Sequence, residues 1–230
     1  MKLAVGVVLL AGLALVTPAS AADLGATPES DAFSWTGGYI GINTGYSWGH
    51  SASAYDNAEL AAFAPLDSDP AGWLGGLTAG INQEVGGGLV VGIEGNVDYG
   101  DVTSTIPDIA ATLPPTPLYG QTITSRTDWS GTLRGRVGFA AGKLLPYLTA
   151  GLSVANVTVS ATDGPLSESA ILTGWTAGGG VEFALDEHWS ANAEYLYTSF
   201  GSHTWFASDP WASTSTSTSS TVMGGINYRF

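Results

Sequence analysis

The feature of this sequence that most constrains its fold is a regular alternation of large apolar residues with small or polar ones. It is clearest at 89–99, where the odd positions from Leu89 to Tyr99 are mostly apolar and the even positions include Glu94 and Asp98. Because successive side chains of a β-strand point to opposite faces, this segment predicts a strand with one apolar and one polar face.

Eight segments follow the same rule. We predict strands at 35–48, 73–83, 89–99, 129–141, 147–157, 171–185, 189–200 and 222–230. The gaps between them alternate in length, and the short gaps carry residues typical of turns, such as Gly86-Gly87-Gly88 and Asp186-Glu187. Outer-membrane barrels have this alternation of long external loops and short periplasmic turns. The pattern therefore predicts an all-β fold over 34–230, an eight-stranded antiparallel up-and-down transmembrane β-barrel with both termini periplasmic.

The long gaps are polar or of low complexity. The first carries several acidic residues, the second a Pro cluster at 114–117, and the last the Ser/Thr run Ser213–Thr221. We interpret all three as mobile surface loops.

The first residues have the pattern of a secretory signal peptide. Lys2 precedes an apolar run from Leu3 to Val16, and the small-residue site Ala19-Ser20-Ala21 follows. We predict a signal peptide over 1–21, with cleavage after Ala21 or alternatively after Ala22, and a short periplasmic leader over 22–33. An apolar run this short does not span a bilayer. The chain has no Cys, so rigidity must come from closure of a sheet.

A secreted β-sandwich is the soluble alternative, since its strands also alternate. A sandwich would hide its large aromatic residues in a core. Here Trp and Tyr lie near the ends of the predicted strands, as an interfacial girdle requires, and the chain ends on Phe230 at the end of the last one. We therefore favour the barrel.

Seven charged residues fall on the polar face of the predicted strands. They are Glu94, Asp98, Arg134, Arg136, Glu182, Glu194 and Arg229. An eight-stranded barrel is only wide enough for side chains, and buried charges must be paired. We predict a network of ion pairs that holds the barrel closed. The alternative is a narrow or gated conducting path lined by these charges.

Signals for other functions are weak. His50 and His203 flank the first and last predicted strands, which must pair on closure, so the two could approach each other and hold a haem iron or a metal. Two solvated loop histidines are the better interpretation, and we expect no cofactor and no enzymatic activity. The net charge is −14, or −15 once Lys2 leaves with the signal (−14 − 1), which argues against nucleic-acid binding.

Several blocks of this chain resemble a known family. They are WTGGYIG at 35–41, GINQ at 80–83, TLRGRVG at 132–138, GWTAGGGVE at 174–182 and GINYRF at 225–230. The sequence over 35–230 resembles the small porin-like outer-membrane β-barrels of alphaproteobacteria, which include hemin-binding and immunodominant surface proteins. The resemblance implies insertion by the outer-membrane assembly machinery, which would recognise the last strand through Phe230, with Tyr228 and Ile226 on the same face.

We therefore expect an integral protein of the bacterial outer membrane with a structural, surface-exposed envelope role; a very small porin is also compatible with the pattern. The alternative function is a loop-borne receptor or adhesin for haem or a host ligand. The expected partners of the protein are outer-membrane lipids, lipopolysaccharide and the assembly machinery. Its acidic loops are expected to meet divalent cations of the lipopolysaccharide layer. Fold alone does not decide between these roles.

Overall fold

The computed structural model describes residues 33–56, 67–106, 122–161, 167–208 and 212–230. The predicted signal peptide (1–21) and all of the predicted leader except Phe33 lie outside the described residues. The described part of the chain includes no helix long and apolar enough to cross a membrane.

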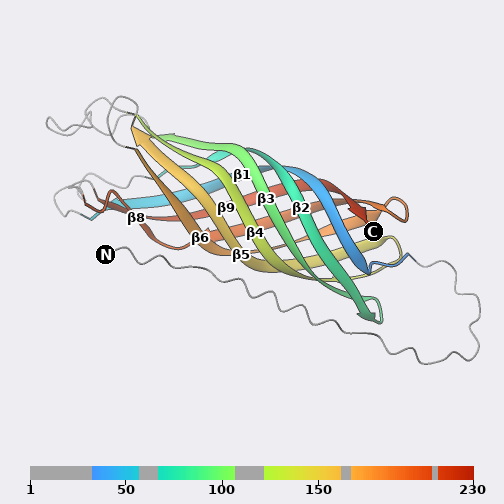
Figure 1. Cartoon of the computed structure of the whole chain (residues 1–230). Coiled ribbons are helices and arrows are strands. Elements are labelled where there is room, and N and C mark those ends of the chain that lie inside the picture. Colours follow the sequence, from blue (N-terminus) through green and yellow to red (C-terminus); the bar gives the residue numbers. More distant parts are fainter. Residues whose placement is uncertain (1–32, 57–66, 107–121, 162–166, 209–211) are drawn as a thin grey trace, which may run out of the picture. The chain divides into compact units, whose positions relative to one another are not determined.

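Eight long strands and one short strand form a single antiparallel sheet (Figure 1). The strands are β1 (Gly37–Tyr55), β2 (Ala71–Gly86), β3 (Leu89–Ile106), β4 (Ile123–Phe139), β5 (Leu144–Ala161), β6 (Ser167–Ala184), β7 (Trp189–Phe200), β8 (His203–Trp205) and β9 (Ser213–Arg229). Each long strand pairs with the next, and β1 also pairs with β9, so the sheet closes on itself. The predicted eight-stranded antiparallel barrel is confirmed, and β8 is a short addition that pairs with the start of β9.

The closing seam between β1 and β9 is the longest continuous pairing of the first strand. It runs from Tyr39 opposite Arg229 to Tyr55 opposite Ser213. The prediction that Ser213–Thr221 is a loop was therefore wrong. Thr is a strong strand former, but a run in which both faces carry small hydroxyl residues has no apolar–polar alternation to reveal a strand.

The two ends of the barrel differ in their connections. At one end, here called the turn end, tight connections join β2 to β3, β4 to β5 and β6 to β7, and β1 begins beside the end of β9. Gly86, Gly87 and Gly88 all adopt positive φ there, the conformation that favours glycine in tight turns. The opposite end, here called the loop end, carries the longer connections.

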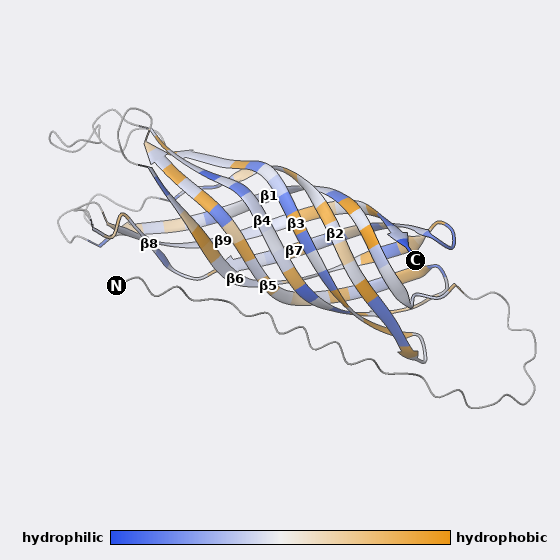
Figure 2. Cartoon of the chain, viewed as in Figure 1, coloured by the Kyte–Doolittle hydropathy of each residue, from blue (hydrophilic) through white to orange (hydrophobic). Residues whose placement is uncertain are grey.

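The apolar parity of the strands faces outward, as predicted. Ile42, Leu77 and Leu152 leave 63%, 66% and 68% of their surface exposed, which in this closed barrel means that they face lipid. Figure 2 shows hydrophobic residues recurring at intervals along the strands. Ring contacts join Tyr46 to Trp48 and Trp73 toward the loop end, and Trp189 to Tyr228 at the turn end, so aromatic groups lie at both edges of the apolar band.

Trp35 does not belong to the first strand, where the sequence pattern had placed it. It precedes β1, is fully buried, and packs with Val90, Leu145 and Ala184 inside the turn end. Its indole Nε1 donates to the carbonyl oxygen of Gly142 at 3.0 Å. A wide apolar side chain therefore lies inside this end of the barrel.

Candidate functional site in the barrel interior

The structure places all seven predicted interior charges inside the barrel, each no more than 6% exposed. Alternation along the strands brings them there from five strands: β3, β4, β6, β7 and β9. They are also the only charged residues that are buried among the described residues.

Arg134 lies at the centre of this set. Its Nη2 donates to Glu94 Oε1 at 2.5 Å, and its Nη1 donates to Glu194 Oε1 at 2.8 Å. Glu94 is the register neighbour of Arg134 on the adjoining strand, whereas Glu194 belongs to β7, across the lumen. Nη2 also donates to Asn96 at 2.9 Å. The guanidinium group therefore bridges opposite walls of the barrel.

Arg136 makes a second bridge one layer nearer the turn end. Its Nη2 donates to Glu182 Oε2 at 2.8 Å, and its Nη1 donates to the Tyr39 hydroxyl oxygen at 2.9 Å. The Tyr39 hydroxyl in turn donates to Glu94 Oε2 at 2.7 Å. The guanidinium carbon lies 3.9 Å from the centroid of the Tyr147 ring, a close cation–π contact.

Glu182 connects this network to the closed turn end. It accepts hydrogen bonds from the Ser190 hydroxyl at 2.6 Å and from the Asn227 amide at 3.2 Å. Arg229 Nη1 lies 3.8 Å from Glu182 Oε1, and Arg229 Nη2 donates to the Trp35 carbonyl oxygen at 2.7 Å. The charge network is therefore in contact with the buried Trp35 cluster at the turn end.

The geometry of the network sets its energetic character. Transfer of single ions from water into such an interior costs several kcal/mol, which pairing with good geometry offsets. The guanidinium groups of Arg134 and Arg136 each face carboxylates on two strands.

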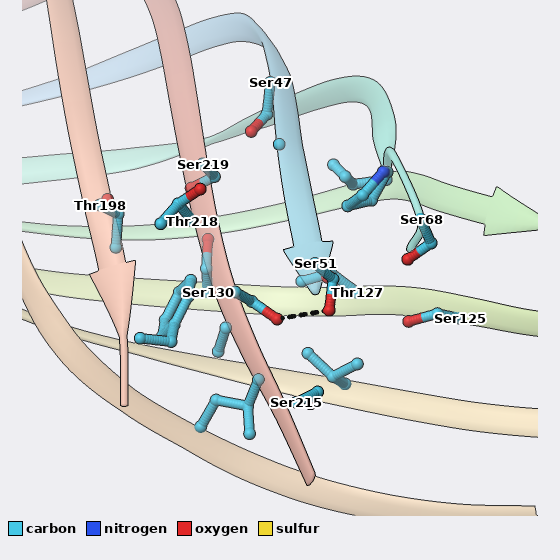
Figure 3. Close-up of a pocket in the computed structure, with 18 of the residues that line it drawn as sticks. Ser47, Ser51, Ser68, Ser125, Thr127, Ser130, Thr198, Ser215, Thr218 and Ser219 are labelled. Atoms are coloured by element: carbon cyan, nitrogen blue, oxygen red, sulfur yellow. Dashed lines mark hydrogen bonds between the residues drawn. The ribbon is translucent and has the colours of Figure 1, made fainter. Parts of the chain in front are cut away.

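Beyond the network, toward the loop end, the lumen widens into a cavity of about 210 Å³. Hydroxyl residues of β1, β4 and β9 line much of it, and Figure 3 shows Ser47, Ser130 and Ser215 among them. Another part of the wall is apolar. It is formed by a buried cluster of Ala155, Val157, Leu172 and Trp205.

Asp98 is the one charge of the seven that lines this cavity. It makes no ion pair with any described residue, and its Oδ1 has no hydrogen-bond partner there. The structure therefore brings six of the predicted charges into one network and leaves the seventh apart from it.

The two histidines are not brought together as the sequence had suggested. His50 on β1 lies opposite Thr218, and His203 on β8 lies opposite Ser215, so strand β9 separates them. His50 Nδ1 is 2.8 Å from Asp69 Oδ1, and His203 packs on the Trp205 ring. No group of three metal-ligating residues occurs among the described residues. This geometry offers no site for a haem iron or a metal held by both histidines.

The residues of the predicted assembly signal lie together on the outer face of β9. Ile226, Tyr228 and Phe230 are all exposed, and the rings of Tyr228 and Phe230 are in contact. The Phe230 backbone amide donates to the Gly38 carbonyl oxygen at 3.1 Å, which fixes the last residue to the first strand.

Sequence reasoning missed several residues of the interior. Tyr39 has the same parity as the polar face of β1, and Tyr147 has the same parity as Thr149, so counting parity would have placed both phenols inside. Trp205 gave no such signal, because β8 is too short to show alternation.

A closed antiparallel barrel with an apolar outer band, aromatic edges and an ion-paired interior defines an integral membrane β-barrel. Sequence comparison names the family: the chain belongs to the outer membrane protein β-barrel domain family, whose model matches residues 7–230. It is a protein of the bacterial outer membrane.

Two relatives illustrate the match. The 31 kDa outer-membrane immunogenic protein of Brucella melitensis biotype 1 is 35% identical, over 97% of this chain and 99% of the relative. The 22 kDa outer membrane protein of Rhizobium leguminosarum bv. viciae is 30% identical, over 76% of this chain and 69% of the relative. The chain is thus an outer-membrane β-barrel of a family that includes outer-membrane immunogenic proteins.

The solved structures that the comparison matched are more distant. The outer membrane protein OprG from Pseudomonas aeruginosa is 15% identical with a TM-score of 0.49, over 85% of this chain and 96% of that one. Neisserial surface protein A is also 15% identical, with a TM-score of 0.44, over 82% and 97% of the two chains.

Proposed function

We propose that this protein is a structural, surface-exposed barrel of the outer membrane whose lumen is closed to ions. The observation that carries the proposal is the pair of bridges from Arg134 to Glu94 and Glu194, and from Arg136 to Glu94 and Glu182. Together with Trp35 they fill the turn-end half of an interior that is only wide enough for side chains.

The proposal includes an orientation. The turn end, with its short connections and the end of β9, faces the periplasm, and the loop end faces outward, following the general asymmetry of outer-membrane barrels. The lipid-facing residues contact outer-membrane lipid and lipopolysaccharide, and the assembly machinery reads Ile226, Tyr228 and Phe230. The loop-borne receptor or adhesin hypothesis concerns mainly 57–66, 107–121, 162–166 and 209–211, which lie outside the described residues.

Conductance in planar bilayers, measured beside heat-modifiability on gels, tests the proposal. We expect the detergent-folded wild type to show no unitary conductance steps. The double variant Arg134→Gln, Arg136→Gln should lose the heat-resistant folded band. It removes the cation from four buried ion-pair contacts and leaves their carboxylates uncompensated. Arg126→Gln is the matched control, since Arg126 also lies on β4 but is half exposed at the loop end.

Stable single-channel conductance in the wild type, changed in ion selectivity by the double variant while the barrel stays folded, would establish a small porin and overturn the proposal. A folded double variant that still conducts nothing would show that the network is not what closes the lumen.

A further inference from the structure

The cavity at the loop end has a charge with no ion-pair partner among the described residues. Among the described residues, three cations and four anions are buried in the barrel, which leaves one negative charge in excess (3 − 4 = −1). The unpaired anion is Asp98. It is 5% exposed and lines the cavity, and although Asn43 hydrogen-bonds its carboxylate, Oδ1 has no partner among the described residues.

The other cations of the described barrel have partners elsewhere: Arg126, half exposed at the loop end, pairs with Asp101 and Asp128, and Lys143 lies in the turn between β4 and β5. Arg134 lies near Asp98, but its terminal nitrogens are bound to Glu94, Glu194 and Asn96. The connections at the loop end contain no Lys or Arg, including the parts outside the described residues. They hold seven acidic residues, among them Asp67 and Asp69, so the field at the mouth attracts cations.

The apolar part of the cavity wall suits an apolar body. Ala155, Val157, Leu172 and Trp205 are all buried there, flanked by Phe200 and Phe206. This apolar surface faces a cavity whose remaining wall is rich in hydroxyl groups. Ligand sites typically combine such an apolar wall with a few placed polar groups.

The aromatic part of this wall is held in place by specific contacts. The Trp205 indole Nε1 donates to the Ser215 hydroxyl at 2.9 Å, and the Phe206 amide donates to Glu168 Oε2 at 2.5 Å. Phe206 has a φ of 52°, a strained conformation for a bulky residue. Strain of this kind persists only where surrounding contacts impose it.

We propose that the loop-end cavity binds a small cationic amphiphile, an ammonium group attached to a compact apolar body. The ammonium pairs with the Asp98 carboxylate on the floor of the cavity. The apolar body lies against Val157, Leu172 and Trp205, and the facing hydroxyl groups of β1 and β9 accept the remaining ammonium hydrogens. A cavity of about 210 Å³ limits the ligand to a single ring or a short chain. The site is independent of the proposed closure of the lumen.

Isothermal titration calorimetry of four small probes against the folded full-length barrel in nanodiscs tests the proposal. The probes are cyclohexylammonium, neutral cyclohexanol, anionic cyclohexanecarboxylate and methylammonium. We expect saturable one-to-one binding of cyclohexylammonium that is at least about tenfold tighter than that of the other three, as one desolvated charge pair and one apolar contact would each provide. Equal affinity for cyclohexanol would remove Asp98 from recognition, and equal affinity for methylammonium would remove the apolar wall.

Two variants localise the effect. Asp98→Asn keeps the shape of the side chain and should weaken cyclohexylammonium binding at least about tenfold while leaving cyclohexanol unchanged. Asp101→Asn, on the same strand at the exposed rim, removes an equal charge and should leave both affinities as they are. An unchanged affinity in Asp98→Asn, with the heat-modifiable band intact, would overturn the proposal. If Asp98→Asn does not fold, the four-probe comparison on the wild type still decides it.

Discussion

Arg134 on β4 and Glu194 on β7 meet across the lumen, with 2.8 Å between Nη1 and Oε1, although two strands separate them along the sheet. The pair therefore reports the closed state of the barrel itself. A sheet that opened at any seam would separate these two side chains and leave each of them as an uncompensated buried charge.

Removal of Glu194 should consequently be costly. In Glu194→Ala, Arg134 loses its partner on the far wall, and breaking a buried pair in this way costs about 3–5 kcal/mol of unfolding free energy. Urea unfolding of the lipid-reconstituted barrel measures it. Asp101→Ala breaks the exposed contact with Arg126 and should cost less than about 1 kcal/mol. Equal losses in the two variants would mean that the buried bridge does not stabilise the barrel.

Gly80 gives Tyr39 its place in the network. A Cβ at Gly80 would fall on the Tyr39 ring and 2.8 Å from the carbonyl oxygen of Ile93. Gly80→Ala should therefore displace the phenol from Glu94 and Arg136 and cost about 1–3 kcal/mol, as overpacking does. Gly95→Ala is the control, because its Cβ would meet only the Thr132 carbonyl oxygen at an ordinary 3.6 Å. The same urea assay compares the two, and a stable Gly80→Ala would contradict the packing described here.

The sequence predicted which charged residues lie inside the barrel better than it predicted which of them form ion pairs. Parity along a strand was enough to place Arg134 and Glu194 inside, because it depends only on local geometry. Their pairing depends on the stagger between strands far apart in the sheet, which no local pattern contains. The isolation of Asp98 was hidden for the same reason. Trp35 was misplaced because an aromatic residue near a strand end fits both an interfacial girdle and an internal plug.

The start of β9 shows another limit of the sequence pattern. Ser213–Thr221 looks like a loop, yet each residue from Ser213 to Thr221 has a partner on β1. We therefore expect slow hydrogen exchange over 213–221, with protection comparable to 222–229. A Ser217→Pro variant should lose protection locally, since proline cannot donate a ladder hydrogen bond. Fast exchange of 213–221 in the wild type would restore the loop interpretation.

The turn between β6 and β7 provides a pH-dependent test. Asp186 Oδ1 accepts hydrogen bonds from the backbone amides of His188 and Trp189, both at 2.8 Å. These two donors hold the pKa of the Asp186 carboxyl below its ordinary value of 3.8. A carboxyl with a lowered pKa in the folded state stabilises that state fully above its unfolded pKa, and this contribution disappears as the pH falls through the folded value.

The expected result is therefore confined to acid conditions. The urea concentration at the unfolding midpoint of the wild type should decrease as the pH is lowered below about 4. Asp186→Ala should remove Asp186's share of that decrease, and it should lower the midpoint at pH 7. Asp186→Asn keeps an oxygen that can accept one amide but has no charge to lose, so its midpoint should lie between the other two at pH 7 and should also lack Asp186's share of the acid fall. If wild type and Asp186→Ala show parallel midpoint curves down to pH 2, the charge of the turn carboxylate does not contribute to folding. A constant offset between such curves would then measure the hydrogen bonds that Asp186 accepts from the amides of His188 and Trp189, which do not depend on its charge.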